Sequence, residues 1–369
     1  MGKNVLLIAD FAAPYRGNFI PSLERLEQLY EPQGRVVYLF PTVAEHIPWM
    51  QDFKRLHKVY FIDRTYNKNV TLANVRMLLR IIKEYEIGII HSHFGSYNFT
   101  LFVLKRLLGC KVKFIQHIHG EHVNAMTWKE NFRLWSIRHT FDKFIACGPA
   151  VEKSFKLLLP HDKLITISNG IDFSRLISDH TADNTNAQNE EINDKIVNVL
   201  MFGWPFNVKG IDIAMKAINK LRHPGKNILL NVILSGDRER IEQQMRGVFD
   251  GILPDWVTIL PSRPDVVHYY NNADIFLSCS RTEGLSYAVL EASACNCEMV
   301  VSDIAGNALD IPTMGIFKTD DVDDCAAKIL EKINEPKEVK RANLQVRHEY
   351  VREHYSLDRW ARQVIAHYQ

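Results

Sequence analysis

The sequence contains no long apolar segment. None of its 369 residues lies in a run that approaches about 18 consecutive apolar residues, the length that a membrane-spanning helix needs. The apolar run in Met1–Ala9 is too short for the core of a signal peptide, and Leu6 stands where a myristoylation signal has Ser or Thr. We therefore expect a cytoplasmic protein, with peripheral contact at the inner face of a membrane as the further expectation.

Cysteines and nucleotide-binding signatures are also sparse. The six cysteines are scattered, and Cys295 and Cys297 lack the two-residue gap of a zinc-binding pair, so we expect buried, reduced thiols. No Gly-x-Gly-x-x-Gly follows the first predicted strand, which argues against a dinucleotide-dependent oxidoreductase. Basic residues are not interleaved with aromatic ones in a stripe, and we expect no nucleic-acid partner.

Charge is distributed unevenly along a chain of ordinary globular composition. Residues 1–180 contain 24 Lys and Arg against 16 Asp and Glu, whereas residues 181–369 contain 21 against 27. A solvated basic surface is the simpler explanation for the first half. The alternative is that this half meets an anionic acceptor or an anionic membrane surface.

Short β-rich runs alternate with amphipathic helical patterns from the first residues onward. In the first half the predicted strands are Asn4–Ala9, Arg35–Phe40, Lys58–Ile62, Gly88–His91, Val112–His117, Lys143–Cys147 and Leu164–Ile167. The predicted helices between them are Phe19–Tyr30, Val75–Tyr85, Phe99–Leu108 and Ala150–Leu159. This alternation predicts a doubly wound, mostly parallel α/β sheet.

The alternation restarts after an almost wholly polar segment, 178–195, which we interpret as a linker. The second set of predicted strands is Val197–Phe202, Leu229–Leu234, Val257–Leu260, Ile275–Cys279 and Met299–Ser302. The predicted helices are Ile211–Leu221, Arg240–Phe249, Val266–Asn271 and Ser286–Cys295. We therefore expect two Rossmann-like doubly wound domains, 1–177 and 196–355, facing across a cleft. A terminal helix in 356–369 would cross back to the first domain.

Two carboxylates, Glu283 and Glu291, flank a turn that joins a predicted strand to a predicted helix. The backbone N–H groups of Gly284, Leu285 and Ser286 lie at the start of this helix, where an anion such as phosphate can bind. The carboxylates beside such an anion would then accept hydrogen bonds from hydroxyl groups. The alternative is an ordinary strand-to-helix junction with solvated glutamates.

A lysine follows the first predicted strand of the second domain in Gly203-Trp-Pro-Phe-Asn-Val-Lys-Gly210. Lys209 precedes a helix, where its flexible ammonium group can reach phosphate oxygens. Taken alone, it fits an exposed helix-start lysine. Together with the anion site at Gly284–Ser286, it predicts a clamp for a diphosphate.

These segments resemble the retaining, nucleotide-sugar-dependent glycosyltransferases of the GT-B fold, the group called glycosyl transferases group 1. In the first domain the resemblance is carried by Ile89–His93, Gln116–Gly120, Ile145–Ala150 and Ile165–Asp172. In the second it is carried by Phe202–Gly210 and Ser280–Glu291. The motifs occur in the family's order along most of the chain.

The resemblance implies roles for individual residues. Lys209 would bind the donor diphosphate, and the amides from Gly284 through Leu285 to Ser286 would hold the distal phosphate. Glu291 would accept hydrogen bonds from the ribose hydroxyls, and Glu283 would hold hydroxyls of the transferred sugar. His119 would approach that sugar from the other domain, and the loop around Gly17 would touch the phosphates when the cleft closes.

Trp204 departs from the family pattern, which has an arginine at this position. Another residue, such as Arg281 or Arg263, would have to supply the missing charge. Otherwise, Trp204 stacks on part of the ligand, or the affinity for the donor is low.

Histidines are frequent in the first-domain motifs, but their close spacing fits no common metal-ligand signature, and we expect no metal site. For His91, His93, His117 and His122 we expect core histidines with satisfied hydrogen bonds.

The resemblance thus implies a metal-independent, retaining enzyme that transfers a sugar from a UDP- or GDP-sugar to a glycan or lipid-linked acceptor, without a further cofactor. Surface polysaccharide or glycolipid synthesis is the setting it suggests. Two alternatives are a nucleotide-sugar epimerase of the same fold and a non-catalytic subunit that binds sugar nucleotides.

Overall fold

The computed structural model describes residues 2–64, 68–122, 127–176, 196–222, 227–234, 236–295 and 297–369. The chain forms two compact units, and the predicted linker, 178–195, lies outside the described residues. The first unit comprises Met1–Gly170 and Leu357–Gln369, and the second comprises Ile171–Ser356.

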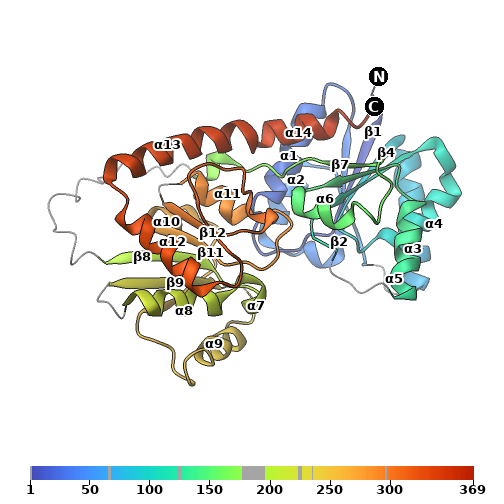
Figure 1. Cartoon of the computed structure of the whole chain (residues 1–369). Helices are drawn as coiled ribbons and strands as arrows, with labels where there is room; N and C mark the ends of the chain where they lie inside the picture. Colours follow the sequence, from blue (N-terminus) through green and yellow to red (C-terminus); the bar gives the residue numbers. More distant parts are fainter. Residues whose placement is uncertain are drawn as a thin grey trace. The chain divides into compact units, whose positions relative to one another are not determined.

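The first unit is built on a seven-stranded sheet in which every pair of neighbouring strands is parallel. The strand order is β3-β2-β1-β4-β5-β6-β7. Figure 1 labels β1, β2, β4 and β7 of this sheet. The strands are β1 (Asn4–Ala9), β2 (Val36–Pro41), β3 (Val59–Ile62), β4 (Ile87–His93), β5 (Lys113–Ile118), β6 (Lys143–Ala146) and β7 (Leu164–Thr166). Each lies within two residues of a strand predicted from the sequence.

Helices cover both faces of this sheet. They are α1 (Phe19–Tyr30), α2 (Pro48–Leu56), α3 (Lys68–Glu84), α4 (Asn98–Leu108), α5 (Trp128–Arg138), α6 (Pro149–Phe155) and α14 (Leu357–Ile365). Apolar residues of α1, α2 and α14 share one core cluster with one face of the sheet, whereas α3 and α5 both pack beside α4. The sequence did not predict α2 or α5, and α3 begins earlier than the predicted Val75.

The terminal helix α14 packs on α1 within the first unit. Trp360 and Val364 are buried in its core, and the rings of Tyr368 and Tyr30 meet edge to face at 5.3 Å. The Arg25 guanidinium donates to both carboxylate oxygens of Asp358, at 2.6 and 2.8 Å. Apolar burial and a two-bond ion pair therefore tie the end of the chain to its first helix.

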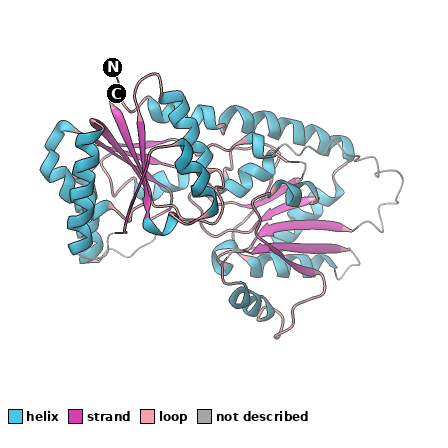
Figure 2. Cartoon of the chain, turned by 180° about the vertical axis from the view of Figure 1, so that it is seen from behind, coloured by secondary structure: helices cyan, strands magenta, loops and turns pink. Residues whose placement is uncertain are grey.

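The second unit has a six-stranded, wholly parallel sheet of order β10-β9-β8-β11-β12-β13. Figure 2 shows the strands of both sheets in magenta and the helices in cyan. Its strands are β8 (Val197–Phe202), β9 (Ile228–Leu234), β10 (Val257–Pro261), β11 (Ile275–Ser278), β12 (Glu298–Ser302) and β13 (Gly315–Phe317). Its helices are α7 (Phe206–Lys209), α8 (Ile211–Arg222), α9 (Arg238–Arg246), α10 (Val267–Asn271), α11 (Tyr287–Ser293), α12 (Val322–Asn334) and α13 (Lys337–His354).

Helices α12 and α13 were not predicted from the sequence, and α13 is held by buried charges. The Arg347 guanidinium is inaccessible to solvent, lies 3.4 Å from Glu298 and donates to the carbonyl of Cys297 at 2.8 Å. Lys332 of α12 lies 3.5 Å from the same Glu298 carboxylate. Removing Glu298 would leave the buried Arg347 charge without its carboxylate partner.

Five of the six cysteines are buried, as predicted, whereas Cys110 is exposed in the 3-10 turn that follows α4. Within the described ranges of the chain, no helix has both the length and the apolar character that crossing a bilayer requires.

Candidate functional site

The predicted donor residues of the second unit follow neighbouring parallel strands, where a doubly wound sheet places its ligands. Lys209 ends the short helix α7 after β8, and Glu283 follows β11, which pairs with β8. Gly210 adopts a left-handed φ of 63°, and a side chain there would collide with the carbonyl oxygen of Cys279. The chain can therefore pass from α7 to α8 against the end of β11 only with glycine at this position.

Lys209 and Glu283 form an ion pair, in which Lys209 Nζ contacts Glu283 Oε1. The same carboxylate oxygen accepts a hydrogen bond from Ser280 Oγ at 3.1 Å. The two side chains retain 19% and 17% of their exposed area, so the pair can be reached by a ligand while it is partly desolvated. The sequence predicted both residues, but not their contact with each other.

The backbone of Gly284–Ser286 is less open than the sequence predicted. The N–H of Ser286 donates to the carbonyl of Gly306 at 2.8 Å, and a side chain at Gly306 would collide with the carbonyl of Glu283. Because one of the three predicted donors already has an acceptor, a phosphate would be left with the amides of Gly284 and Leu285. The predicted three-amide anion site is corrected to two amides.

Glu291 is buried on α11, with 7% of its surface exposed. Tyr270 donates a hydrogen bond to it at 2.9 Å, and Arg175 lies 3.5 Å from its other oxygen. Burial, followed by the charge of Glu291, raises the pKa of the Tyr270 hydroxyl well above its ordinary value, so this group remains a donor. Neither Tyr270 nor Arg175 was predicted, because no local motif marks them.

Arg281 is committed to structural contacts. Its guanidinium donates to both oxygens of Asp212 at 3.1 and 2.9 Å, to Asp320 at 2.6 Å and to the carbonyl of Asn207 at 2.6 Å. Hydrogen bonding to Asp212 is the largest cause that raises the pKa of Arg281. The structure therefore gives Arg281 a role in joining loops, and supplying the missing donor-binding charge would require it to leave these carboxylates.

Trp204 stands at the end of β8 with 39% of its surface exposed. Its indole ring lies against the backbone of Gly236, where a Cβ atom would be 3.1 Å from the ring. An exposed, rigid aromatic surface therefore stands where the family has an arginine, and it can stack on a planar group but cannot pair with a phosphate.

His119 lies in the first unit and lines a cavity of about 280 Å³ together with Phe94, Gln116, Glu121, Arg133 and other residues. Burial lowers the pKa of His119 to about 3, so the ring is neutral at pH 7. A neutral imidazole can donate to, or accept from, a sugar hydroxyl. Gly17, also in this unit, has a left-handed φ of 54° with open space around it.

His91, His93, His117 and His119 form a histidine column on one face of the sheet, because β4 and β5 are paired and each contributes side chains two positions apart. His91 shares a 2.6 Å hydrogen bond with Tyr368, and His93 shares a 3.0 Å bond with His119. Burial lowers the pKa of each of the four imidazoles well below its ordinary value.

The prediction of satisfied core histidines is only partly right. Among the described residues, neither nitrogen of His117 has a hydrogen-bond partner, and the Nε2 atoms of His91, His93 and His122 have none. Ligand atoms of His91, His93 and His117 lie within 4.8 Å of one another, so these three could hold a metal ion. Spacing along the sequence hid this arrangement, because it arises across two strands.

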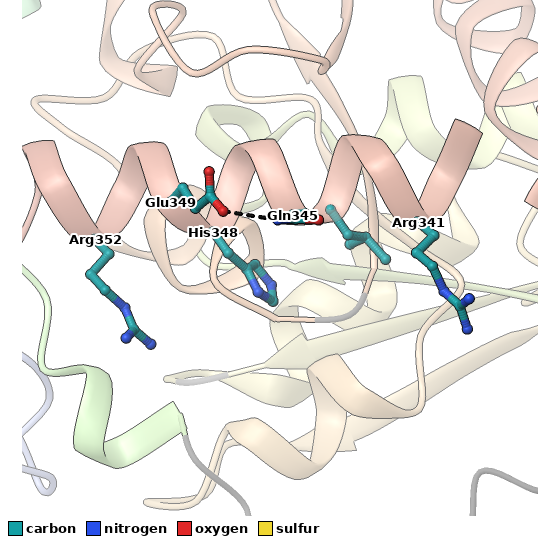
Figure 3. Close-up of a pocket in the computed structure, with 6 residues that line it drawn as sticks. Arg341, Gln345, His348, Glu349 and Arg352 are labelled. Atoms are coloured by element: carbon teal, nitrogen blue, oxygen red, sulfur yellow. Dashed lines mark hydrogen bonds between the residues drawn. The ribbon is translucent and has the colours of Figure 1, made fainter. Parts of the chain in front are cut away.

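A second hollow, of about 490 Å³, runs along α13 in the second unit (Figure 3). Its lining, which includes Arg341, His348 and Arg352, comes from this one helix. It contains none of the predicted site residues.

Comparison with known proteins gives matches to both halves of the chain. The family described as Glycosyl transferases group 1 matches residues 194–335, and the one described as Glycosyltransferase Family 4 matches residues 32–175. A yeast protein, the GPI3 subunit of phosphatidylinositol N-acetylglucosaminyltransferase from Saccharomyces cerevisiae, is 21% identical over 83% of this chain and 69% of its own length. A human protein that is also part of a phosphatidylinositol N-acetylglucosaminyltransferase is 24% identical over 82% of this chain and 62% of its own length.

Solved structures share the fold over the whole chain. A glycosyltransferase from Rickettsia africae superposes with a TM-score of 0.79 at 16% identity, covering 100% of this chain and 98% of the other. Anabaena HepE in complex with UDP and glucose superposes with a TM-score of 0.75 at 13% identity, covering 99% of both chains. The group 1 model covers most of the second half of the chain, and the Family 4 model covers most of the first half. Together with two parallel-sheet units and these structural neighbours, the matches make the chain a glycosyltransferase of the group 1 type with the GT-B fold.

Proposed function

We propose that the protein is a retaining, metal-independent enzyme that moves a hexosyl or related sugar from a UDP- or GDP-sugar to a glycan or lipid-linked acceptor. Surface polysaccharide or glycolipid synthesis is the setting. Two similar proteins support this choice of substrates. HepE has been crystallised with UDP and glucose, and the yeast GPI3 protein belongs to a transferase whose name includes phosphatidylinositol.

The observation that carries the proposal is the Lys209–Glu283 ion pair after β8 and β11. The backbone amides of Gly284 and Leu285 follow Glu283 directly. They are the candidate donors for an anion, because the Ser286 N–H already donates to the carbonyl of Gly306. A diphosphate placed there would meet one cation and two N–H donors, and Glu283 would turn toward the hydroxyls of the attached sugar. Glu291, positioned by Tyr270, would accept from the ribose.

The proposed reaction needs no base on the protein. The bond between the anomeric carbon and the phosphate oxygen breaks, and the acceptor oxygen forms a bond to the same face of that carbon. The acceptor proton passes to the departing phosphate oxygen. Lys209 and the amides stabilise the negative charge that develops on the phosphate, which is the role of preorganised donors in group transfer.

His119 and the 280 Å³ cavity belong to the acceptor side in this proposal. The neutral ring would hold a hydroxyl of the transferred sugar without introducing a second positive charge near a forming cationic carbon. The cavity is lined by apolar residues such as Phe155 and Leu159 and by Glu121 and Arg133, the latter paired with Glu130. It therefore suits an acceptor that carries both apolar and polar groups.

A specific observation favours a second candidate, a non-catalytic subunit that binds sugar nucleotides. Trp204 replaces the family's arginine, and Arg281 is occupied by Asp212 and Asp320. Of the predicted cations, Lys209 and Arg263 then remain for the diphosphate. Such a protein would bind a donor and release no nucleoside diphosphate, whereas an epimerase of this fold would change the sugar without an acceptor.

A thermal-shift screen with UDP-, GDP- and ADP-sugars tests the proposal. One donor should raise Tm, and Lys209→Ala should make the shift smaller without abolishing it. Lys220→Ala is the matched control, because Lys220 lies on α8 of the same unit and pairs with Asp323. A product assay with the stabilising donor then separates transfer from epimerisation. Absence of a shift with every donor would reject the proposed enzyme.

A further inference from the structure

An exposed aromatic surface covers the neighbouring helices α4 and α5 in the first unit. We call it the α4–α5 surface. It consists of Phe99 and Phe102 on α4, and Trp128, Phe132 and Trp135 on α5. Trp128 is 75% exposed, Phe132 50%, Phe99 45% and Trp135 43%. Large aromatic side chains gathered in this way on an exposed face mark an interaction site.

Four of the five rings of the α4–α5 surface form a continuous strip, and Trp128 lies one helical turn before Phe132 on the same face of α5. Ring centroids lie 6.3 Å apart between Phe99 and Phe102, 5.6 Å between Phe102 and Trp135, and 5.8 Å between Trp135 and Phe132. On α5, positions 128, 132 and 135 follow the spacing of one helical face, while Leu134 and Ile137 of the opposite face are buried. Helix α5 therefore has two apolar faces. Packing in the protein core explains the face with Leu134 and Ile137, but not the exposed aromatic face.

Cations surround the strip. Residues 98–111 contain three basic side chains and no acidic one, and residues 127–139 contain three basic side chains and one acidic one. The acidic one, Glu130, is buried and forms an ion pair with Arg133. The Arg106 guanidinium lies 5.0 Å from the Phe102 ring, and the Lys129 ammonium lies 5.8 Å from the Trp128 ring. Lys105 is paired with Asp142. The positive charge of this surface therefore rests on Arg106, Lys111, Lys129 and Arg138.

We propose that the α4–α5 surface docks on an anionic lipid bilayer. Trp and Phe side chains favour the interface between lipid head groups and acyl chains, and neighbouring Lys and Arg side chains are attracted to anionic head groups. An aromatic strip with cations at its edge combines the two. The proposal extends the proposed function, because a lipid-linked acceptor would be met at such a surface, but its test does not depend on enzyme activity.

Vesicle flotation provides the test, with phosphatidylcholine vesicles and with vesicles of phosphatidylcholine and phosphatidylglycerol in equal parts. The wild-type chain should bind the anionic vesicles, and added salt should weaken this binding. Trp128→Ser with Phe132→Ser should lower the partition coefficient at least tenfold. Arg106→Gln and Lys129→Gln should each lower it about fivefold on anionic vesicles only.

Leu56→Ser is the matched control. Leu56 is an apolar residue, 77% exposed, on α2 of the same unit, whose core residues pack with α1 on the other helical layer. This variant should bind vesicles as the wild type does, and circular dichroism should show that all variants are folded.

Three results would overturn the proposal: no binding of the wild type to anionic vesicles, equal binding by the Trp128/Phe132 variant, or equal loss in the Leu56 variant. Self-association that disappears in the Trp128/Phe132 variant, without vesicle binding by the wild type, would assign the surface to a second copy instead. A donor thermal shift on the same preparations separates the two proposals. Vesicle binding without a donor shift would reject only the enzyme, and a donor shift without vesicle binding would reject only the docking surface.

Discussion

The hydroxyl of Tyr270 donates a hydrogen bond to the buried carboxylate of Glu291 across 2.9 Å. The two residues lie 21 positions apart, on α10 and α11. If Glu291 binds the ribose, Tyr270 fixes the direction of its oxygens. Tyr270→Phe should therefore raise the KM for the donor about tenfold, because a hydrogen bond to a charged group is lost, while kcat changes little. Initial-rate kinetics would measure both constants.

Tyr269→Phe is the matched control for this prediction. The Tyr269 hydroxyl donates its hydrogen bond to the carbonyl of Pro261 at 2.7 Å, whereas Tyr270 donates to Glu291. Equal KM values for the two variants would show that Tyr270 does not position the carboxylate.

Lys209 should matter more for turnover than for donor binding. In Lys209→Ala the charge that opposes the developing phosphate anion is removed, and kcat should fall by more than about tenfold. Glu283→Gln keeps the size of the side chain but removes the charge that pairs with Lys209, and we expect a smaller loss. Steady-state kinetics with both variants would test this order. Unchanged turnover in Lys209→Ala would reject the proposed role of Lys209 at the diphosphate.

Arg281 should contribute to stability and not to donor affinity. Arg281→Ala breaks contacts with Asp212, Asp320 and the carbonyl of Asn207, and should lower the free energy of unfolding by on the order of 1 kcal/mol, since the side chain is partly exposed. Arg281→Lys should not restore it, because lysine cannot form the two-bond contact with Asp212. Urea unfolding measures the first effect and donor titration the second. A large loss of donor affinity with unchanged stability would place Arg281 at the phosphate.

The histidine column should make the protein sensitive to acid. Burial lowers the pKa of these imidazoles in the folded state, with that of His91 at about 3, whereas an unfolded histidine titrates near 6.5. The unfolded state therefore binds more protons below about pH 6.5, and stability should fall there by up to about 1.4 kcal/mol per pH unit for each histidine. Above that pH these groups should have no effect.

Tm measured between pH 7.5 and 5 tests this expectation. His117→Phe keeps a ring in the column, removes two nitrogens that have no partner among the described residues, and should make the fall of Tm with acid less steep. An identical pH profile for this variant would show that His117 titrates normally in the folded chain.

Removal of metal ions should change neither activity nor stability if the proposed metal-independent mechanism holds. Dialysis against EDTA, followed by kinetics and a thermal melt, provides the measurement. A lower Tm after chelation that zinc restores in the wild type, but not in His117→Phe, would instead show that His91, His93 and His117 hold an ion.

Local pattern alone was enough to predict most of the secondary structure. The β-branched strands of both sheets and the alternation with helices follow from neighbouring residues, so two parallel α/β units could be predicted. The short strand Gly315–Phe317 carries too little pattern, and α5 presents an apolar outer face that hides the helical periodicity. Lys209, Glu283 and Glu291 could be predicted as site residues because their motifs are contiguous.

The partners of those residues came only from the tertiary structure. Glu283 meets Lys209 across 74 positions, and Glu291 meets Arg175 across 116. The N–H of Ser286 donates a hydrogen bond to the carbonyl of Gly306. His117 lies beside His93 because the two residues are paired in the register of β4 and β5. The sequence by itself determined the family, the succession of strands and helices along the chain and the chemistry of the site residues, since these depend on residue type and local spacing. Only the fold decided which charges are paired, which backbone amides can still bind a ligand and which histidines are inaccessible to solvent. These properties depend on distances between segments that are remote in the chain.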